Sequence, residues 1–84
     1  MKIENIKKGK GTWSVDVSGV NIKVKNSTAV AKLFIDGKLQ DIFWGIFLSP
    51  HLFGKLPNGK EVKVVLGGVI KMHCDIFVDN KLDV

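Results

Sequence analysis

Disulfide bonds and long apolar runs are both missing from this chain. Cys74 is the only cysteine, so no internal disulfide can form, which is typical of proteins in a reducing compartment. The longest apolar run, Ile42 to Leu48, has seven residues, whereas a membrane-spanning helix needs about 20. The segment Met1 to Lys10 carries charges and no apolar stretch of the kind that marks a secretory signal. We therefore expect a cytoplasmic protein that makes no membrane contact.

Arginine is absent, and all 13 basic residues behind the net charge of +5 are lysines. The planar guanidinium group is the preferred donor for specific contacts with bases and phosphates. Its absence weighs against sequence-specific recognition of nucleic acid, and a solvated, charged surface is the simplest explanation of the lysines. Attraction to nucleic acid or to another anionic surface remains the alternative.

Helical periodicity is lacking as well, because no stretch of ten residues keeps apolar side chains three and four positions apart. Polar and apolar residues instead alternate, for example over Trp13 to Val17 and Ile22 to Lys25, as in half-buried strands. We expect a single domain, residues 1–84, that folds as an antiparallel β-sandwich or small barrel of seven or eight strands. Residues 1–11 form either a flexible tail or an edge strand. The turn signals between the strands are Ser18-Gly19, Asp36-Gly37, Asn58-Gly59 and Gly67-Gly68.

The segment Leu39 to Leu48 allows two interpretations: one long buried strand that bends at Gly45, or a strand followed by an irregular piece. Beyond it, short strands are expected at Phe53 to Leu56 and from Glu61 onward, with His51 in a loop. The alternation also predicts a core, made of Trp13, Val15, Val17, Ile22, Val24, Leu33, Ile35, Val64, Met72, Cys74, Ile76 and Val78. The last long strand is expected over Ile70 to Val78, followed by a terminal strand over Lys81 to Val84.

One segment of the sequence occurs twice. Leu33 to Leu39 (LFIDGKL) returns 43 residues later as Ile76 to Leu82 (IFVDNKL). An alternating apolar and lysine run precedes each copy, at Ile22 to Lys25 and at Val62 to Val64. Each alternating run, together with the repeated segment that follows it, is typical of two strands that end in a tight turn. The repeat therefore predicts a duplicated β-hairpin.

Two phenylalanines occupy equivalent positions in the repeat. Phe34 and Phe77 each lie on the otherwise polar face of their strand, with Lys32 next to Phe34 on that face. Outward aromatic rings favour a contact with a partner protein or with a second copy of the chain. The alternative is that a neighbouring segment covers the rings. Phe34, Phe77 and Lys32 are therefore the candidate interaction surface of a non-catalytic binding module.

Lysines supply the second candidate surface. Some gather near the start of the chain and others project from the second predicted strand. A sheet that carries lysines among outward aromatic rings can bind single-stranded nucleic acid by charge and by stacking. The candidate anion-binding residues are Lys7, Lys8, Lys10, Lys23 and Lys25.

Catalysis and metal binding lack the residue patterns that they need. Zinc sites usually have four ligands at recognisable spacing, and here only His51, His73 and Cys74 are available as nitrogen or sulfur ligands. His73 and Cys74 are neighbours in a predicted strand and so point to opposite faces. Asp36 and Asp79 lie in equivalent turns, where an aspartate has a backbone role. We therefore expect no enzyme activity, no cofactor and no bound metal.

Several segments together resemble one known family. The stretch Trp13 to Val24, the turn sequence Phe34 to Lys38 and its second copy Phe77 to Lys81 are similar to the opening strands and the two hairpins of the Fas apoptotic inhibitory molecule family. Trp44 and Phe47 stand where that family has a tryptophan-containing strand. The resemblance implies a β-sandwich that acts as a non-enzymatic protein-interaction module.

The chain also departs from that family. Asn26 to Thr28 stands where the family has a histidine-glycine turn, Asn80 replaces a turn glycine, and the loop Ser49 to Gly59 has no counterpart. The resemblance covers Trp13 to Leu82, and these departures limit what it implies about function more than what it implies about fold.

Overall fold

The computed structural model describes residues 3, 6–9, 11–27, 30–45, 50–67 and 73–79. None of these residues lies in a helix, and none forms the long apolar helix that a bilayer crossing would need. They form eight strands: β1 (Lys7–Gly9), β2 (Thr12–Val17), β3 (Val20–Ser27), β4 (Val30–Ile35), β5 (Lys38–Trp44), β6 (His51–Lys55), β7 (Glu61–Gly67) and β8 (His73–Asp79).

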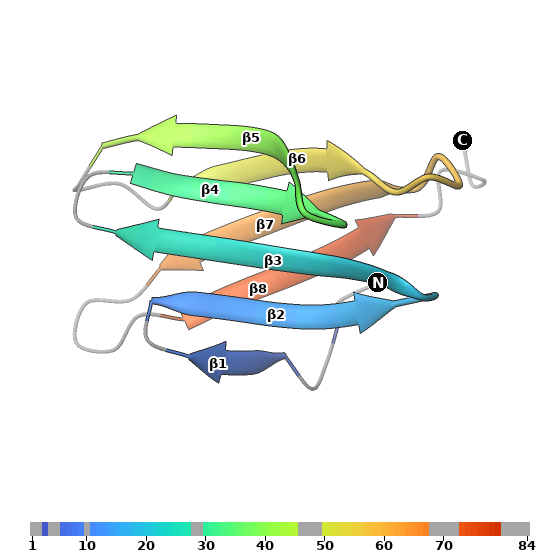
Figure 1. Ribbon diagram of the computed structural model, residues 1–84. Helices are drawn as coiled ribbons and strands as arrows, with labels where there is room; N and C mark the ends of the chain where they lie inside the picture. Colours follow the sequence, from blue (N-terminus) through green and yellow to red (C-terminus); the bar gives the residue numbers. More distant parts are fainter. Residues whose placement is uncertain are drawn as a thin grey trace.

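The strands build two antiparallel sheets that stack face to face (Figure 1). One sheet has five strands in the order β1-β2-β3-β4-β5, and the other has three in the order β6-β7-β8. Within each sheet every strand therefore pairs with its neighbour in sequence, as expected when short turns connect antiparallel strands, and the chain changes sheet between β5 and β6. The predicted all-β sandwich is confirmed, and the described strands form two separate sheets rather than the small barrel that was its alternative.

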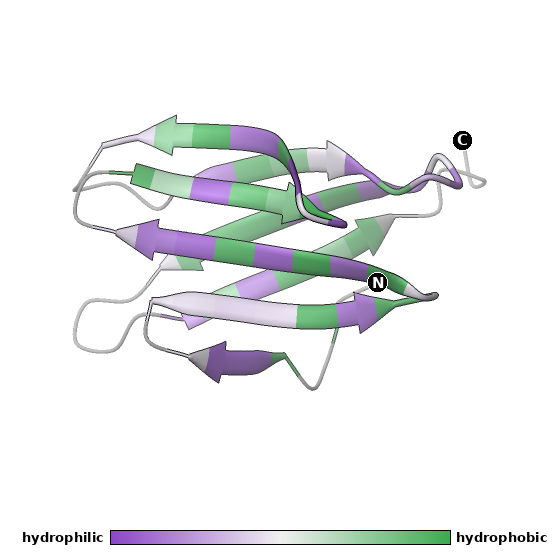
Figure 2. Ribbon diagram, in the orientation of Figure 1, coloured by the Kyte–Doolittle hydropathy of each residue, from purple (hydrophilic) through white to green (hydrophobic). Residues whose placement is uncertain are grey.

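The core lies between the two sheets, because alternate side chains of each strand point into this space. The alternation is visible along β3, where hydrophobic and hydrophilic bands succeed one another (Figure 2). Full burial of a leucine, isoleucine or valine contributes roughly 1.5–3 kcal/mol, so these inward positions dominate the stability of the sandwich. The buried apolar residues are Trp13, Ile22, Val24, Ala31, Leu33, Ile35, Leu52, Leu56, Val62, Val64, Leu66, Cys74, Ile76 and Val78.

Most of the predicted core is confirmed. Val15 and Val17 are corrected, since they are only partly buried and pack against the edge of the core. Met72 lies outside the described residues. The prediction missed Val62 and Leu66 on β7, together with Leu52 and Leu56.

The sequence repeat corresponds to two hairpins, β3–β4 in one sheet and β7–β8 in the other. Their strand registers match: Lys23 lies opposite Phe34 in the first hairpin, and Lys63 lies opposite Phe77 in the second. The turn that follows β8 in the second copy lies outside the described residues. The inward pairs match as well: Ile22 with Ile35 and Val24 with Leu33 in the first hairpin, and Val62 with Val78 and Val64 with Ile76 in the second.

The Asp36-Gly37 turn joins β4 to β5, as the sequence predicts. Both residues have positive φ, 51° and 79°, which is the requirement of the two-residue turn that suits a twisted hairpin. The Asp36 carboxylate accepts a hydrogen bond from the Asn21 backbone N–H at 2.9 Å, and the Asp36 N–H donates to the Asn21 carbonyl at 2.8 Å. Asp36 thus fixes the turn against the start of β3.

The segment after this turn differs from one expectation. β5 ends at Trp44, and it is not a long buried strand, because Leu39 is 53% exposed and Trp44 is 71% exposed. Residues 46–49 are outside the described part, so the irregular continuation is not tested. His51 is the first residue of β6 and does not lie in the expected loop.

The ends of the chain are described only in part. Lys7–Gly9 pairs with β2 as a short edge strand. For this stretch of residues 1–11 the edge strand, and not the flexible tail, is confirmed. The Ile3 N–H donates to the Ile76 carbonyl at 2.7 Å, so the N-terminal segment also touches β8. The expected start of the last long strand at Ile70 to Met72, and the terminal strand Lys81 to Val84, lie outside the described residues.

Candidate interaction surfaces

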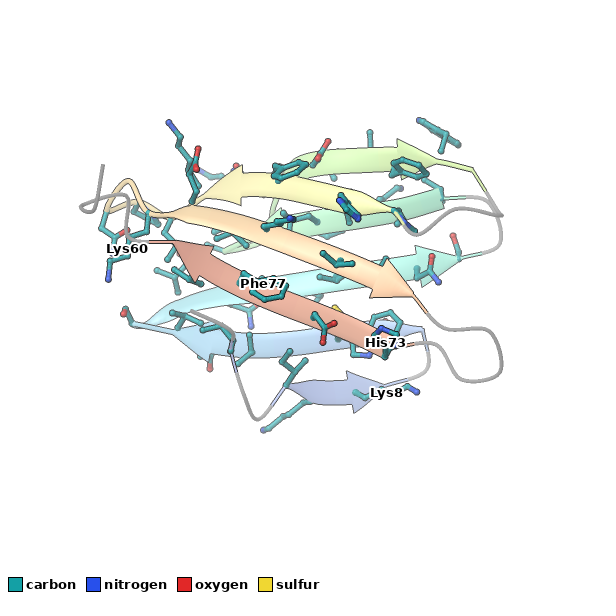
Figure 3. The ribbon with its side chains drawn as sticks, turned by 180° about the vertical axis from the view of Figure 1, so that it is seen from behind. Lys8, Lys60, His73 and Phe77 are labelled. Carbon is teal, nitrogen blue, oxygen red and sulfur yellow. The ribbon has the colours of Figure 1, made fainter. Side chains whose placement is uncertain are left out.

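The structure does not bring Phe34 and Phe77 onto one surface. Each is half-buried between inward residues of its strand, so Phe34 points outward from the five-stranded sheet and Phe77 outward from the three-stranded sheet. Phe77 is seen on the outer face of β8 when the molecule is viewed from behind (Figure 3). Lys32 shares the outer face of β4 with Phe34. The candidate surface of Phe34, Phe77 and Lys32 is therefore corrected to two separate places, because the two copies of the hairpin face each other across the core.

The outer face of the three-stranded sheet carries a cross-strand row of two aromatic rings and one lysine. Phe53 on β6 lies opposite Lys63 on β7, and Lys63 lies opposite Phe77 on β8. Next to this row, the His73 imidazole lies 3.9 Å from the Asp75 carboxylate. The described charges on this face include both signs, so it offers no concentrated positive potential.

Large exposed apolar side chains gather on the two edge strands β5 and β6, which lie side by side along one margin of the sandwich (Figure 1). Among the described residues, the large apolar side chains that are more than half exposed are Leu39 at 53%, Trp44 at 71% and Phe53 at 55%. We call these three residues the β5–β6 margin. Leu39 and Trp44 lie opposite Phe34 and Val30 and so share the outer face of the five-stranded sheet, whereas Phe53 lies on the outer face of the three-stranded sheet. Large exposed apolar side chains that gather along one margin favour a contact site.

The sequence interpretation missed this margin, and a signal existed for only one of its members. Phe53 stands between His51 and Lys55 at a spacing of two, which places it on a polar, outward face of a strand. Trp44 gave no such signal. A register shift at Leu33/Phe34 interrupts the pairing of β4 with β5, so simple alternation does not carry through β5.

Two backbone N–H groups along the margin already have a hydrogen-bond acceptor. The Asp41 carboxylate accepts a hydrogen bond from the Phe53 backbone N–H at 2.9 Å and another from the Ile42 N–H at 2.9 Å. A carboxylate at a strand edge and an irregularity in an edge strand both hinder the addition of a further strand. The margin is thus better suited to side-chain contact than to strand pairing.

The outer face of the five-stranded sheet is basic. Lys25 lies directly opposite Lys32, and Lys23 lies directly opposite Phe34. The Lys25 ammonium group is 5.7 Å from the centroid of the Phe34 ring, a cation–π distance. Within the described part of the chain, none of these three lysines forms an ion pair with a carboxylate. We call Lys23, Lys25 and Lys32 the basic track.

Two hollows flank Lys25 on this face. One has a volume of about 290 Å³ and is lined by Gly11, Thr12, Lys25, Asn26, Ser27, Val30 and Lys32. The other has a volume of about 220 Å³ and is lined by Asn21, Lys23, Lys25, Phe34 and Gly37. Neither lining contains a carboxylate, so lysines supply the charge of both hollows. The donors of Asn21 in the second hollow are already engaged, because its N–H donates to Asp36 and its side-chain amide to Ser14 and Asp16.

The N-terminal lysines are not one cluster. Lys7 lies opposite Ser14 and points to the same outer face as Lys23. Lys8 lies opposite the buried Trp13 and points toward the side of the three-stranded sheet (Figure 3). Lys10 lies outside the described residues. Of the five candidate anion-binding lysines, the structure therefore brings Lys7, Lys23 and Lys25 to one face.

The groups suggested for catalysis or metal binding lie apart. Cys74 is buried, whereas His51 and His73 are exposed on the outer face of the same sheet. Burial raises the pKa of the Cys74 thiol to about 12, and the neighbouring Asp75 carboxylate acts in the same direction. The thiol is thus protonated at neutral pH and is not an activated nucleophile. The described residues contain no group of three or more potential metal ligands.

Comparison of the chain with protein-family models, with curated proteins and with solved structures finds no match. The resemblance to the Fas apoptotic inhibitory molecule family thus stays a hypothesis.

Proposed function

We propose that this protein is a non-catalytic binding module that contacts another protein chain, in the first place a second copy of itself, through the β5–β6 margin. The observation that carries the proposal is the exposure of Leu39, Trp44 and Phe53 on two neighbouring edge strands. Removal of one such side chain from water contributes roughly 1.5–3 kcal/mol. Three of them provide a substantial part of the free energy of a moderate association.

The free edges of β5 and β6 determine how a partner can contact the margin. The Phe53 N–H already donates to Asp41, and the bulge in the pairing of β4 with β5 alters the edge of β5. A partner would therefore pack on the apolar side chains and would not extend either sheet. Such a contact persists at high salt, because apolar association is not screened by ions.

The test is the molar mass in solution by light scattering, at low and at high salt. We expect a dimer at both salt concentrations. Phe53→Ser, alone and together with Trp44→Ser, should shift the protein to monomer without loss of its thermal unfolding transition.

A matched control comes from the same cross-strand row. Phe77→Ser makes the same chemical change on β8, at the opposite edge of the three-stranded sheet, and should leave the dimer intact. A wild-type monomer at both salts would contradict self-association. Equal loss of the dimer in Phe53→Ser and Phe77→Ser would contradict the placement at the margin.

The proposal also includes a non-enzymatic role and a cytoplasmic location. A non-enzymatic role agrees in kind with what the resemblance to the Fas apoptotic inhibitory molecule family implies. The protonated, buried Cys74 thiol supports the absence of cysteine catalysis. A cytoplasmic location is proposed from the single cysteine, and fractionation of cells that produce the protein would test it.

A further inference from the structure

The lysine pair on β3 and β4 opposes the stability of the sheet. Lys25 and Lys32 are direct cross-strand neighbours, so their Cα atoms lie about 4.5–5.5 Å apart and both side chains project from the same face. Like charges in this arrangement are destabilising, and neither lysine has a carboxylate partner in the described part of the chain. Residues that destabilise a fold locally, as this like-charged pair does, are expected where a surface serves binding. A bound anion would relieve the repulsion.

The hollow between these lysines has donors suited to an anion. Thr12, Asn26 and Ser27 line it together with the two lysines. The Ser27 hydroxyl already donates to the Val30 carbonyl at 3.5 Å, so the Thr12 hydroxyl and the two ammonium groups are the donors left for an anion. Its wall is fixed by backbone contact, because the Asn26 N–H donates to the Gly11 carbonyl at 2.8 Å. A volume of about 290 Å³ accommodates a phosphate group with its hydration water.

The positive charge continues along β3. Lys23 and Lys25 are two residues apart, so they project from the same face at a separation of roughly 6.5 Å. Lys25 lines both hollows and therefore joins the phosphate-sized hollow to the one that holds Phe34 and Lys23. Lys7 and Lys23 both lie opposite Ser14, which extends the charge toward β1. The track is linear and carries several charges, as a polymer of phosphates requires.

We infer that the basic track binds the phosphate backbone of single-stranded nucleic acid, with Phe34 as a stacking surface for a base. In the free protein the Lys25 ammonium group lies 5.7 Å from the centroid of the Phe34 ring. When a phosphate attracts this ammonium group, the ring becomes available to a base. Single strands are favoured over duplexes because their bases can reach an aromatic ring. Lysines without arginine give charge attraction without base recognition, so the binding is independent of sequence.

This inference does not depend on the proposed self-association, since the basic track and the β5–β6 margin share no residue. The two surfaces adjoin, because Leu39 of the margin lies opposite Phe34 on the outer face of the five-stranded sheet. Light scattering reports on the margin, and nucleic-acid binding reports on the track. Either proposal can therefore fail without the other.

The experiment measures binding of a fluorescently labelled single-stranded oligothymidylate by anisotropy, over a range of salt from about 50 mM upward. The test variant is Lys25→Gln/Lys32→Gln, which keeps part of each aliphatic stem and removes both charges. Affinity should fall about tenfold or more. Each phosphate contact to a single strand contributes about 0.7 to the slope of log K against log salt, so the slope should weaken by about 1.4.

The matched control is Lys55→Gln/Lys63→Gln on the outer face of the other sheet. It removes the same two charges from the net charge of +5, so it separates the track from net charge. Affinity and salt slope of this variant should stay close to those of the wild type. Phe34→Leu should weaken binding at an unchanged salt slope, because it removes stacking but not a phosphate contact. Thermal unfolding verifies that each variant is folded.

Several outcomes would overturn the inference. These are no binding by the wild type at about 50 mM salt, an equal loss in the two double variants, and tighter binding of a duplex of the same length. Inorganic polyphosphate or an acidic phosphopeptide that displaces the oligonucleotide with higher affinity would overturn the assignment to nucleic acid.

Discussion

The carboxylate of Asp41 on β5 accepts a hydrogen bond from the backbone N–H of Phe53 on β6, at 2.9 Å. Asp41 belongs to the five-stranded sheet and Phe53 to the three-stranded sheet, so this bond joins the two sheets at their shared margin. The second carboxylate oxygen accepts from the Ile42 N–H. A single side chain therefore accepts from two backbone donors, one in each sheet.

Replacement of this carboxylate should destabilise the sandwich. Asp41→Ala leaves both N–H groups to be satisfied by water, and we expect a loss of about 1–3 kcal/mol in the free energy of unfolding. Asp41→Asn keeps one acceptor oxygen and should lose less. Urea denaturation of the wild type and of both variants measures the difference, and an unchanged midpoint for Asp41→Ala would show that water replaces the carboxylate fully.

A glycine on β6 permits the close approach of the two sheets. A Cβ atom at Gly54 would lie 3.0 Å from Cδ1 of Ile35 and 3.1 Å from Cβ of Gln40, on β4 and β5. Gly54→Ala should therefore destabilise the protein by about 1–3 kcal/mol through overpacking, seen as a lower melting temperature.

Gly9 on β1 supplies the control for this substitution. Its nearest neighbour atom would lie 3.8 Å from the added Cβ, and its φ is not positive. Gly9→Ala should leave the melting temperature unchanged or raise it slightly, since alanine loses less conformational entropy than glycine in a strand. Equal melting temperatures for Gly54→Ala and Gly9→Ala would contradict the close contact.

The buried thiol predicts a dependence of stability on alkaline pH. The pKa of Cys74 is raised from 9.0 to about 12 in the folded protein by burial and by Asp75. The unfolded chain therefore releases this proton above pH 9 while the folded chain keeps it. Its contribution is fully present below pH 9 and is lost as the pH rises toward about 12. Denaturation across this window should show a smaller alkaline decline for Cys74→Ala than for the wild type.

The same thiol should be inert while the protein is folded. A thiol-reactive probe at neutral pH should label Cys74 slowly in native buffer and rapidly in urea, because the thiolate is the reactive species. Rapid labelling of the native protein would contradict the buried, protonated thiol.

Alternation of polar and apolar residues predicts much of this fold, because it decides which side chains of a strand point inward. It identified Ile22, Val24, Leu33 and Ile35 as core, and the repeat extends the same reasoning to Ile76 and Val78. Alternation does not decide which sheet a hairpin joins. For that reason Phe34 and Phe77 were expected on one surface, although the two hairpins face each other.

The β5–β6 margin could not be predicted from the sequence for a different reason. Large apolar residues are expected to be buried, and the composition around Trp44 supports that expectation. Its exposure depends on where β5 ends and on its place at the edge of a sheet, both of which follow from tertiary pairing. The position of Lys25 directly opposite Lys32, two like charges, likewise depends on the register of β3 and β4. The sequence does not specify that register residue by residue.

The matched hairpins also bear on how the chain folds. A half-length chain that held one copy of the hairpin would expose its whole apolar face, and would bury it only by meeting another molecule at sufficient concentration. With both copies in one chain, that meeting becomes intramolecular, and a short linker gives an effective concentration in the millimolar range. Formation of the core is thus independent of how much protein the cell makes. Cleavage between β5 and β6 would be expected to restore the concentration dependence, with the two fragments reassembling only when mixed.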